Sequence, residues 1–261
     1  MRPLASALAL AVLAIGCGGA PVEPAPTSRA PAPTSTVTVT TSDGVTVFGE
    51  VYDGGLPRSA PLVLLFHQAG SSGRGEYGPL IGWLNGLGWR AVAWDQRSGG
   101  DTHGVGNRTA EALPAGTPAA FCDATPDLAA AFDWATEGGA ERVVVWGSSY
   151  SAALAVRLAA DRPEVAGVIA ASPASGGPMA DCRARDRVAD VEAPVLVLRP
   201  ASEMGLASAQ EQREVLTAAG ATFIVVEHGV HGSSMLVDAR TGHDMAAARE
   251  QVAAWLRRVV G

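Results

Sequence analysis

The stretch VVVWGSSYSAALAV, Val143 to Val156, joins an apolar run to a helical pattern and holds three serines within four positions. The run RVVVW (142–146) is typical of a strand that is buried on both faces, and a helix is expected to begin near Ser149. A sharp turn between such a strand and helix can present a serine as a nucleophile. The stretch therefore poses the question which of its serines could take that position.

Steric demands distinguish the three serines. In a nucleophile elbow the residues two before and two after the serine approach each other across the turn, so both must be small, and the serine has a strained, positive φ. Ser148 fails because a tryptophan and a tyrosine flank it in this way, and Ser151 would lie inside the helix. Ser149 is flanked by Gly147 and Ser151, which makes it the candidate nucleophile. The alternative is a small-residue helix start in which Ser149 is only the N-cap.

Length and composition bound the rest of the molecule. A chain of 261 residues with 48% hydrophobic content can bury one sizeable core. The formal charge of −7 and the absence of lysine or arginine clusters argue against a nucleic-acid partner. Neither a P-loop nor a dinucleotide fingerprint is present in the sequence, so we expect no cofactor. The sequence leaves the oligomeric state open.

The N-terminus has the pattern of an export signal. Arg2 is followed by an apolar stretch from Leu4 to Ile15, which is too short to span a bilayer but suits a secretory signal. Cys17, preceded by LAIG, resembles the lipobox cysteine of bacterial lipoproteins. This resemblance implies that residues 1–16 are a signal peptide and that lipidated Cys17 anchors the protein in a bacterial cell envelope. The alternative is plain cleavage beside an incidental cysteine.

The export signal sets expectations for the residues that follow it. Residues 17–36 are rich in Pro, Ala, Ser and Thr, which is typical of a disordered tether, and residues 37–261 are expected to form one domain. In an exported protein we expect Cys122 and Cys182 to form a disulfide rather than to remain free thiols.

Strands and helices alternate along the predicted domain. The segment TVTVTTSDGVTVFGEVY (36–52) alternates with period two around an Asp-Gly turn and predicts an antiparallel hairpin. A mostly parallel, twisted sheet of about eight strands with helices on both faces is therefore expected. The further strands are predicted at 61–66, 90–95, 142–146, 165–171, 193–199 and 221–227, and the helices at 74–87, 127–137, from about 149, 207–219 and 244–260.

The stretch Gly147-Ser148-Ser149-Tyr150-Ser151 resembles the Gly-x-Ser-x-Gly elbow of the α/β-hydrolase superfamily, with Ser151 in place of the second glycine. In that superfamily an acid and then a histidine follow the serine along the chain. The resemblance implies that Glu203, the one carboxylate in PASEMG, is the acid. In HGVHGSS it implies that His231, which lies farther into the loop, is the base rather than His228.

Two further stretches resemble the same superfamily. LLFHQAGS (64–71) is similar to its His-Gly-x loop, with Gln68 in place of the glycine, and this implies that the N–H groups of Ala69 and Tyr150 bind an oxyanion. His67 is expected to bond loop backbone rather than to react. WDQRSGGDTHG (94–104) is similar to a segment whose Asp and Arg brace loops, here Asp95 and Arg97. Asp101 and His103 are expected to lie in a solvated loop.

The predicted domain is closest in kind to the small, capless dienelactone-hydrolase-like enzymes, because residues 172–192 leave room for a short lid only. The leading hypothesis is a serine hydrolase that cleaves small-molecule esters or thioesters through Ser149, His231 and Glu203. The alternatives are a peptidase of the same fold and a non-catalytic binding lipoprotein, which the departures at Gln68 and Ser151 motivate. A metal site at 227–232 is disfavoured, because two histidines on a glycine loop lack the rigidity of a helical pair.

Overall fold

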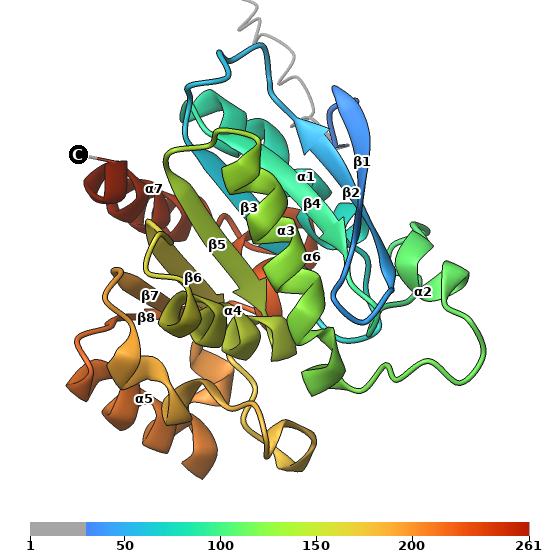
Figure 1. Ribbon diagram of the computed structural model, residues 1–261. Helices are drawn as coiled ribbons and strands as arrows, with labels where there is room; N and C mark the ends of the chain where they lie inside the picture. Colours follow the sequence, from blue (N-terminus) through green and yellow to red (C-terminus); the bar gives the residue numbers. More distant parts are fainter. Residues whose placement is uncertain (1–29, 261) are drawn as a thin grey trace, which may run out of the picture.

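The computed structural model describes residues 30–260 and contains one sheet of eight strands in the order β1-β2-β4-β3-β5-β6-β7-β8 (Figure 1). The first two neighbouring pairs, β1 with β2 and β2 with β4, are antiparallel, and all the others are parallel. The predicted fold class, including the antiparallel start, is confirmed. Cys17 and the signal sequence lie outside the described residues.

The bounds of the elements agree with the predicted ones to within a few residues. The strands are β1 (Ser35–Thr40), β2 (Thr46–Tyr52), β3 (Leu62–Phe66), β4 (Arg90–Asp95), β5 (Val143–Ser148), β6 (Gly167–Ala171), β7 (Val195–Pro200) and β8 (Thr222–Val226). The α-helices are α1 (Gly73–Gly86), α2 (Arg108–Ala112), α3 (Thr125–Glu137), α4 (Tyr150–Asp161), α5 (Ala207–Ala218), α6 (Asp238–Thr241) and α7 (Ala246–Val260). Six 3₁₀ turns complete the described elements: Phe121–Ala124, Gly177–Met179, Ala184–Asp186, Val188–Asp190, Ala201–Glu203 and Gly232–Leu236.

Each face of the sheet has its own hydrophobic core. Successive side chains of a strand point to opposite faces, so in β3 Leu62, Leu64 and Phe66 join one core, and Val63 and Leu65 join the other. The first core packs against α3, α4 and α5, and the second against α1 and α7. In Figure 1, α3 and α4 lie in front of the sheet and α1 lies behind it. Both faces of the central strands are buried, which explains their continuous apolar sequences.

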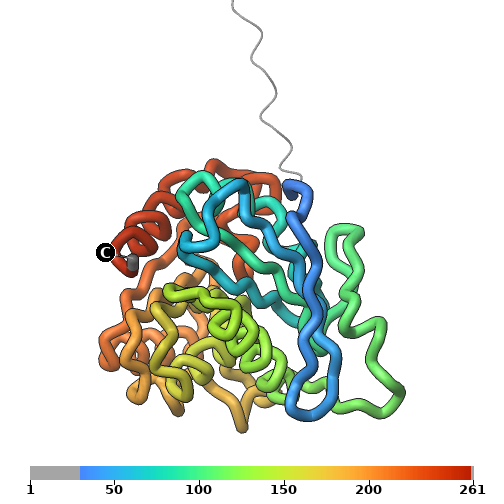
Figure 2. The backbone as a smooth tube through the Cα atoms, turned by 45° about the horizontal axis from the view of Figure 1, so that its top comes forward, coloured from blue at the N-terminus to red at the C-terminus, as the bar shows by residue number. Residues whose placement is uncertain are grey.

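The N-terminal hairpin lies at one edge of the sheet, and β8 with α5 lies at the opposite edge (Figure 2). Its turn has the predicted Gly44, with a φ of 84° that glycine adopts without strain. The predicted tether is two residues too long, because β1 begins at Ser35, and the N–H of Thr34 already donates to the carbonyl of Val51 at 2.7 Å. The period-two alternation begins at Thr36, one residue after β1 begins, so the sequence pattern placed the start of the strand one residue too far along the chain.

Asp95 and Arg97 brace the loops above β4, as the sequence resemblance implies. Asp95 accepts hydrogen bonds from the N–H groups of Gly73 and Arg108 at 2.9 and 3.0 Å. The buried guanidinium of Arg97 forms ion pairs with Asp127 of α3 and with the aspartate of the hairpin turn. These contacts connect the hairpin, β4 and α3 beside the carboxyl ends of the parallel strands.

The segment 172–192 contains three of the 3₁₀ turns, of which Ala184–Asp186 and Val188–Asp190 pack on α4 and Gly177–Met179 packs on the turn Phe121–Ala124. Cys182 in this segment forms a disulfide with Cys122, as expected, with the two Cα atoms 5.7 Å apart. The helices α2 and α6 were not predicted, because four or five residues are too few to show a helical period. Among residues 30–260, none of the helices has the length and apolar character to cross a membrane.

Candidate active site

Ser149 occupies the sharp turn between β5 and α4. Its φ of 59° and ψ of −116° are strained for a residue with a side chain, as the elbow interpretation predicts. A Cβ atom at Gly147 would lie 2.2 Å from the carbonyl oxygen of Ser151, so that position must be glycine. The sequence argument on flanking sizes therefore identified a real steric contact.

Ser151 fits where the superfamily has its second glycine. Its buried Oγ accepts a hydrogen bond from the N–H of Ser148 at 3.0 Å. The same Oγ lies 2.7 and 2.8 Å from the carbonyl oxygens of Phe66 and His67 at the end of β3, to one of which it can donate. The serine thus links the elbow to the neighbouring loop without disturbing the turn.

His231 bridges Ser149 and Glu203. Its Nε2 lies 2.9 Å from Oγ of Ser149, and its Nδ1 lies 2.5 Å from Oε1 of Glu203. The residues belong to three loops, after β5, β7 and β8, whose carboxyl ends meet at one edge of the sheet. The His231 side chain is 48% exposed, so the site is open to solvent.

His228 points elsewhere. Its ring stacks on that of His243, with the centroids 4.1 Å apart and the planes 3° from parallel. The geometry therefore favours His231 over His228 as the partner of Ser149. The two histidines of the disfavoured metal alternative have different partners, and residues 30–260 hold no group of three or more metal-ligating side chains.

Each carboxylate oxygen of Glu203 has its own basic partner. Oε1 faces His231, and Oε2 accepts from Nη1 of Arg199 at 2.8 Å. Burial raises the pKa of Glu203, but the hydrogen bond and charge of His231 and the charge of Arg199 outweigh it, so the pKa is lowered. Arg199 also donates to the carbonyl oxygen of Pro173 at 2.7 Å, which joins the loop of Glu203 to the loop after β6.

The predicted oxyanion donors, Ala69 and Tyr150, follow β3 and β5, which are neighbours in the sheet. Within the described part of the chain, neither N–H donates to a protein acceptor. His67 orients the first donor: its Nε2 accepts from the N–H of Gln96, so the proton is on Nδ1, which donates to the carbonyl of Gln68 at 2.8 Å. Because the C=O and N–H of a trans peptide point in opposite directions, the N–H of Ala69 points away from His67.

The ring of His67 is fully buried, and burial lowers its pKa, which favours the neutral ring. The expectation that it bonds loop backbone agrees with these contacts.

Glu76 is a site residue that the sequence analysis missed. Its buried carboxylate, in the first turn of α1, accepts hydrogen bonds from the N–H of Gln68 at 2.6 Å and from Oγ of Ser148 at 2.5 Å. The one signal in the sequence was a glutamate in the first turn of a helix, which is also an ordinary surface pattern.

The disulfide lies near Tyr150, the second predicted oxyanion donor. Phe121, which precedes Cys122, stacks on the ring of Tyr150 with the centroids 5.0 Å apart. The cross-link to Cys182 therefore holds the wall of the site at Tyr150 against the segment 172–192.

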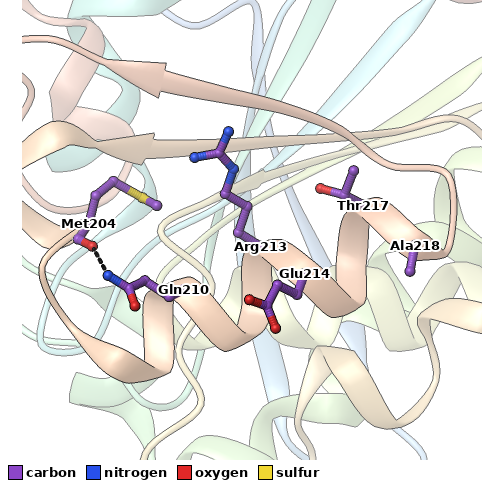
Figure 3. Close-up of a pocket in the computed structure, with 6 residues that line it drawn as sticks. All are labelled: Met204, Gln210, Arg213, Glu214, Thr217 and Ala218. Atoms are coloured by element: carbon purple, nitrogen blue, oxygen red, sulfur yellow. Dashed lines mark hydrogen bonds between the residues drawn. The ribbon is translucent and has the colours of Figure 1, made fainter.

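A hollow of about 730 Å³ lies over α5, close to the turn that carries Glu203 (Figure 3). Met204 and Gln210 meet at one end of it, where the amide of Gln210 donates to the carbonyl of Met204 at 3.1 Å. Arg213, another lining residue, covers the ring of Phe223. None of the residues that line this hollow belongs to the Ser149 site.

The order and direction of the strands are those of the α/β-hydrolase fold. A family model described as serine aminopeptidase, S33, matches residues 57–184. The match covers 128 of the 261 residues and shows a similarity to that family over this part of the chain.

Solved structures have the same fold. An esterase from Pyrococcus furiosus is 19% identical over 87% of this chain and 93% of its own, with a TM-score of 0.65. A dienelactone hydrolase from Anabaena variabilis is 19% identical over 86% and 96%, with a TM-score of 0.61. Est1E from Butyrivibrio proteoclasticus is 13% identical over 87% and 99%, with a TM-score of 0.60. Among proteins whose functions are curated, none matches the sequence.

Proposed function

We propose that the protein is an extracytoplasmic serine hydrolase that cleaves carboxylic esters or thioesters through an acyl-enzyme on Ser149. The observation that carries the proposal is the position of His231, whose two ring nitrogens lie 2.9 Å from Ser149 and 2.5 Å from Glu203. A nucleophile, a base and an orienting acid in this arrangement are what acyl transfer requires.

The proposed reaction has two halves. Oγ of Ser149 attacks the carbonyl carbon while its proton passes to Nε2 of His231, and the N–H groups of Ala69 and Tyr150 stabilise the oxyanion. The C–O or C–S bond breaks, and His231 returns the proton to the leaving alcohol or thiol. Water then repeats the attack on the acyl-enzyme with His231 as base, which releases the acid and restores Ser149. Glu203 stabilises the imidazolium that forms in each half.

Two observations favour this function over the alternatives. The departures from the family motif do not disturb the site, because Ser151 fits the elbow and Gln68 contributes its backbone to the loop. This argues against a non-catalytic binding protein. An aminopeptidase, which the family description suggests, needs a carboxylate for the substrate amine, but Glu203 and Glu76 are already bonded to protein donors.

The proposed location rests on the N-terminal sequence. The apolar stretch before Cys17 supports export and lipidation, and the disulfide between Cys122 and Cys182 is typical of an oxidising compartment. Metabolic labelling of the expressing bacterium with a palmitate analogue tests the anchor, because Cys17→Ser should abolish the label.

Fluorophosphonate labelling of the full-length protein, with the adduct mapped by mass spectrometry, tests the activity. We expect an adduct on Ser149 that His231→Ala abolishes, together with hydrolysis of p-nitrophenyl acetate in preference to alanine p-nitroanilide. A folded protein without an adduct would contradict the hydrolase and favour the binding protein, which would keep its ligand affinity in His231→Ala. Preference for the anilide would favour the peptidase.

A further inference from the structure

The buried carboxylate of Glu76 receives hydrogen bonds from three separate loops. The N–H of Gln68 donates to Oε2 at 2.6 Å, and Oγ of Ser148 and the N–H of Ser233 donate to Oε1 at 2.5 and 3.2 Å. These loops carry, in turn, Ala69, the nucleophile and His231. One side chain thus contacts every loop from which the proposed reaction draws its serine, its base and its first oxyanion donor.

The contact with Gln68 bears on the oxyanion donor. Glu76 holds the N–H of Gln68, and His67 holds the carbonyl of the same residue at 2.8 Å. Both peptide groups of Gln68 are therefore restrained, and the second of them supplies the N–H of Ala69. Loss of the Glu76 contact would free one side of this residue and broaden the range of directions that the Ala69 donor samples.

The other two contacts bear on the distance between nucleophile and base. Oγ of Ser148 accepts from the N–H of Ser233 at 2.9 Å while it donates to Glu76. Ser148 directly precedes Ser149, and Ser233 follows His231 by two residues. The three groups form a closed set of hydrogen bonds that joins the elbow to the histidine loop.

The groups bonded to Glu76 are all donors, yet its pKa stays above the usual value because burial outweighs them. Burial raises the pKa of Glu76, while the bonds from Ser148 and Gln68 and the charge of Arg240 act in the opposite direction. All three bonded groups donate, and an ionised carboxylate only accepts, so in the ionised form the hydrogen bonds are charge-assisted and about twice as strong as neutral ones. Arg240 also ties α6 to α1, since it donates to the carbonyls of Gly75 and Glu76, each at 2.5 Å.

We propose that Glu76 is a positioning residue for the hydrolysis, which aligns the Ala69 donor, Ser149 and His231 by binding their three loops to the first turn of α1. The role rests on the proposed function, but Glu76 itself touches neither the substrate nor the reacting atoms. An amide at this position would offer one acceptor and two unwanted donors to three donor groups.

The test compares Glu76→Gln with Glu50→Gln in the full-length protein. Glu50 is a matched control because it is also buried, and its carboxylate accepts from the hydroxyl of Tyr52 at 2.6 Å on β2. We expect Glu76→Gln to lower kcat for p-nitrophenyl acetate and the rate of Ser149 phosphonylation by about 10- to 100-fold, with KM within twofold, because alignment in the transition state is lost. The control should stay within twofold in all three quantities.

Hydrogen exchange measured by mass spectrometry provides a readout that needs no activity. In Glu76→Gln, exchange should accelerate in segments 66–72, 147–152 and 229–236 together. Acceleration confined to α1, or an unchanged kcat with faster exchange, would overturn the positioning role. A wild-type protein that Ser149 reagents do not label would contradict the proposed function instead, and the exchange data would still show whether Glu76 holds the loops.

If Glu76→Gln does not fold, Ser148→Ala tests the same network by removing only the hydrogen bonds of the Ser148 hydroxyl. It should accelerate exchange in 229–236 and leave 66–72 unchanged, because the bond from Gln68 to Glu76 remains. Equal acceleration of exchange in both segments, or in neither, would contradict the proposal that Glu76 binds the two loops through separate hydrogen bonds.

Discussion

Two glutamates lie close to the nucleophile, and their environments differ. Glu203 is partly exposed and sits between His231 and Arg199, and its pKa is lowered. Glu76 is fully buried and accepts from neutral donors of three loops, and burial raises its pKa. The first is placed to stabilise a charge that appears during the reaction, and the second to hold the parts that react.

The difference shows that the role of a carboxylate near a serine depends on the groups it contacts. Contact with the base makes Glu203 part of the proposed proton transfer, whereas Glu76 can influence the reaction only through other residues. The two should therefore respond differently to loss of charge and to pH.

The largest expected effect is on activity at Glu203. Glu203→Gln should lower kcat by about 10³- to 10⁴-fold, because the amide cannot stabilise the imidazolium of His231 or fix its tautomer. Steady-state kinetics on p-nitrophenyl acetate measures this, with Glu76→Gln beside it. If Glu203→Gln lowers kcat no more than Glu76→Gln does, Glu203 has no role in the reaction beyond positioning.

The next effect concerns the stability that Glu203 contributes. Its lowered folded-state pKa means that the contribution is present above the unfolded value of about 4.3 and is lost as pH falls through the folded-state value. At pH 7, Glu203→Gln should lower the free energy of unfolding by about 1–3 kcal/mol, and the gap should close below about pH 4. Urea denaturation across pH 3–8 measures it, and a gap that widens in acid would contradict the lowered pKa.

Glu76 should show the opposite sign in the same titration. Its raised pKa means that the folded state binds a proton more tightly than the unfolded chain, so its contribution is present at low pH and is lost as pH rises through the folded-state value. The difference in unfolding free energy between wild type and Glu76→Gln should therefore shrink from pH 4 towards pH 8. If the unfolding free energies of the two glutamate variants depend on pH in the same way, the opposite pKa shifts of Glu203 and Glu76 are contradicted.

The smallest expected effect is at Ser151, whose Oγ accepts from the N–H of Ser148. Ser151→Gly restores the family motif but leaves the buried N–H of Ser148 without its acceptor, which costs about 1–2 kcal/mol of stability. Activity should change by no more than about threefold, since the elbow needs only a small residue there. Ser151→Ala is the matched control, and a tenfold gain in activity in either variant would show that the serine distorts the site.

The elbow and the fold could be predicted from the sequence because their signals are local. Gly147 and Ser151 flank Ser149 at fixed spacing, and apolar runs of strand length alternate with helical patterns. The order of serine, acid and histidine then pointed to Glu203 and His231, which the structure brings within hydrogen-bonding distance. The start of β1 was misplaced and the short helices α2 and α6 were missed, because a few residues are too few to show a hydrophobic period.

By itself, the sequence determined the α/β class, the strained serine turn and the chemistry of the residues at the ends of the strands. Only the tertiary structure decided that Arg199 binds the second oxygen of Glu203 and that Glu76 meets Gln68, Ser148 and Ser233. Strand and helix periods and tight turns depend on neighbours within a few residues. The partners of a buried charge depend on which loops the sheet order brings together, and Ser233 lies 157 positions from Glu76 along the chain.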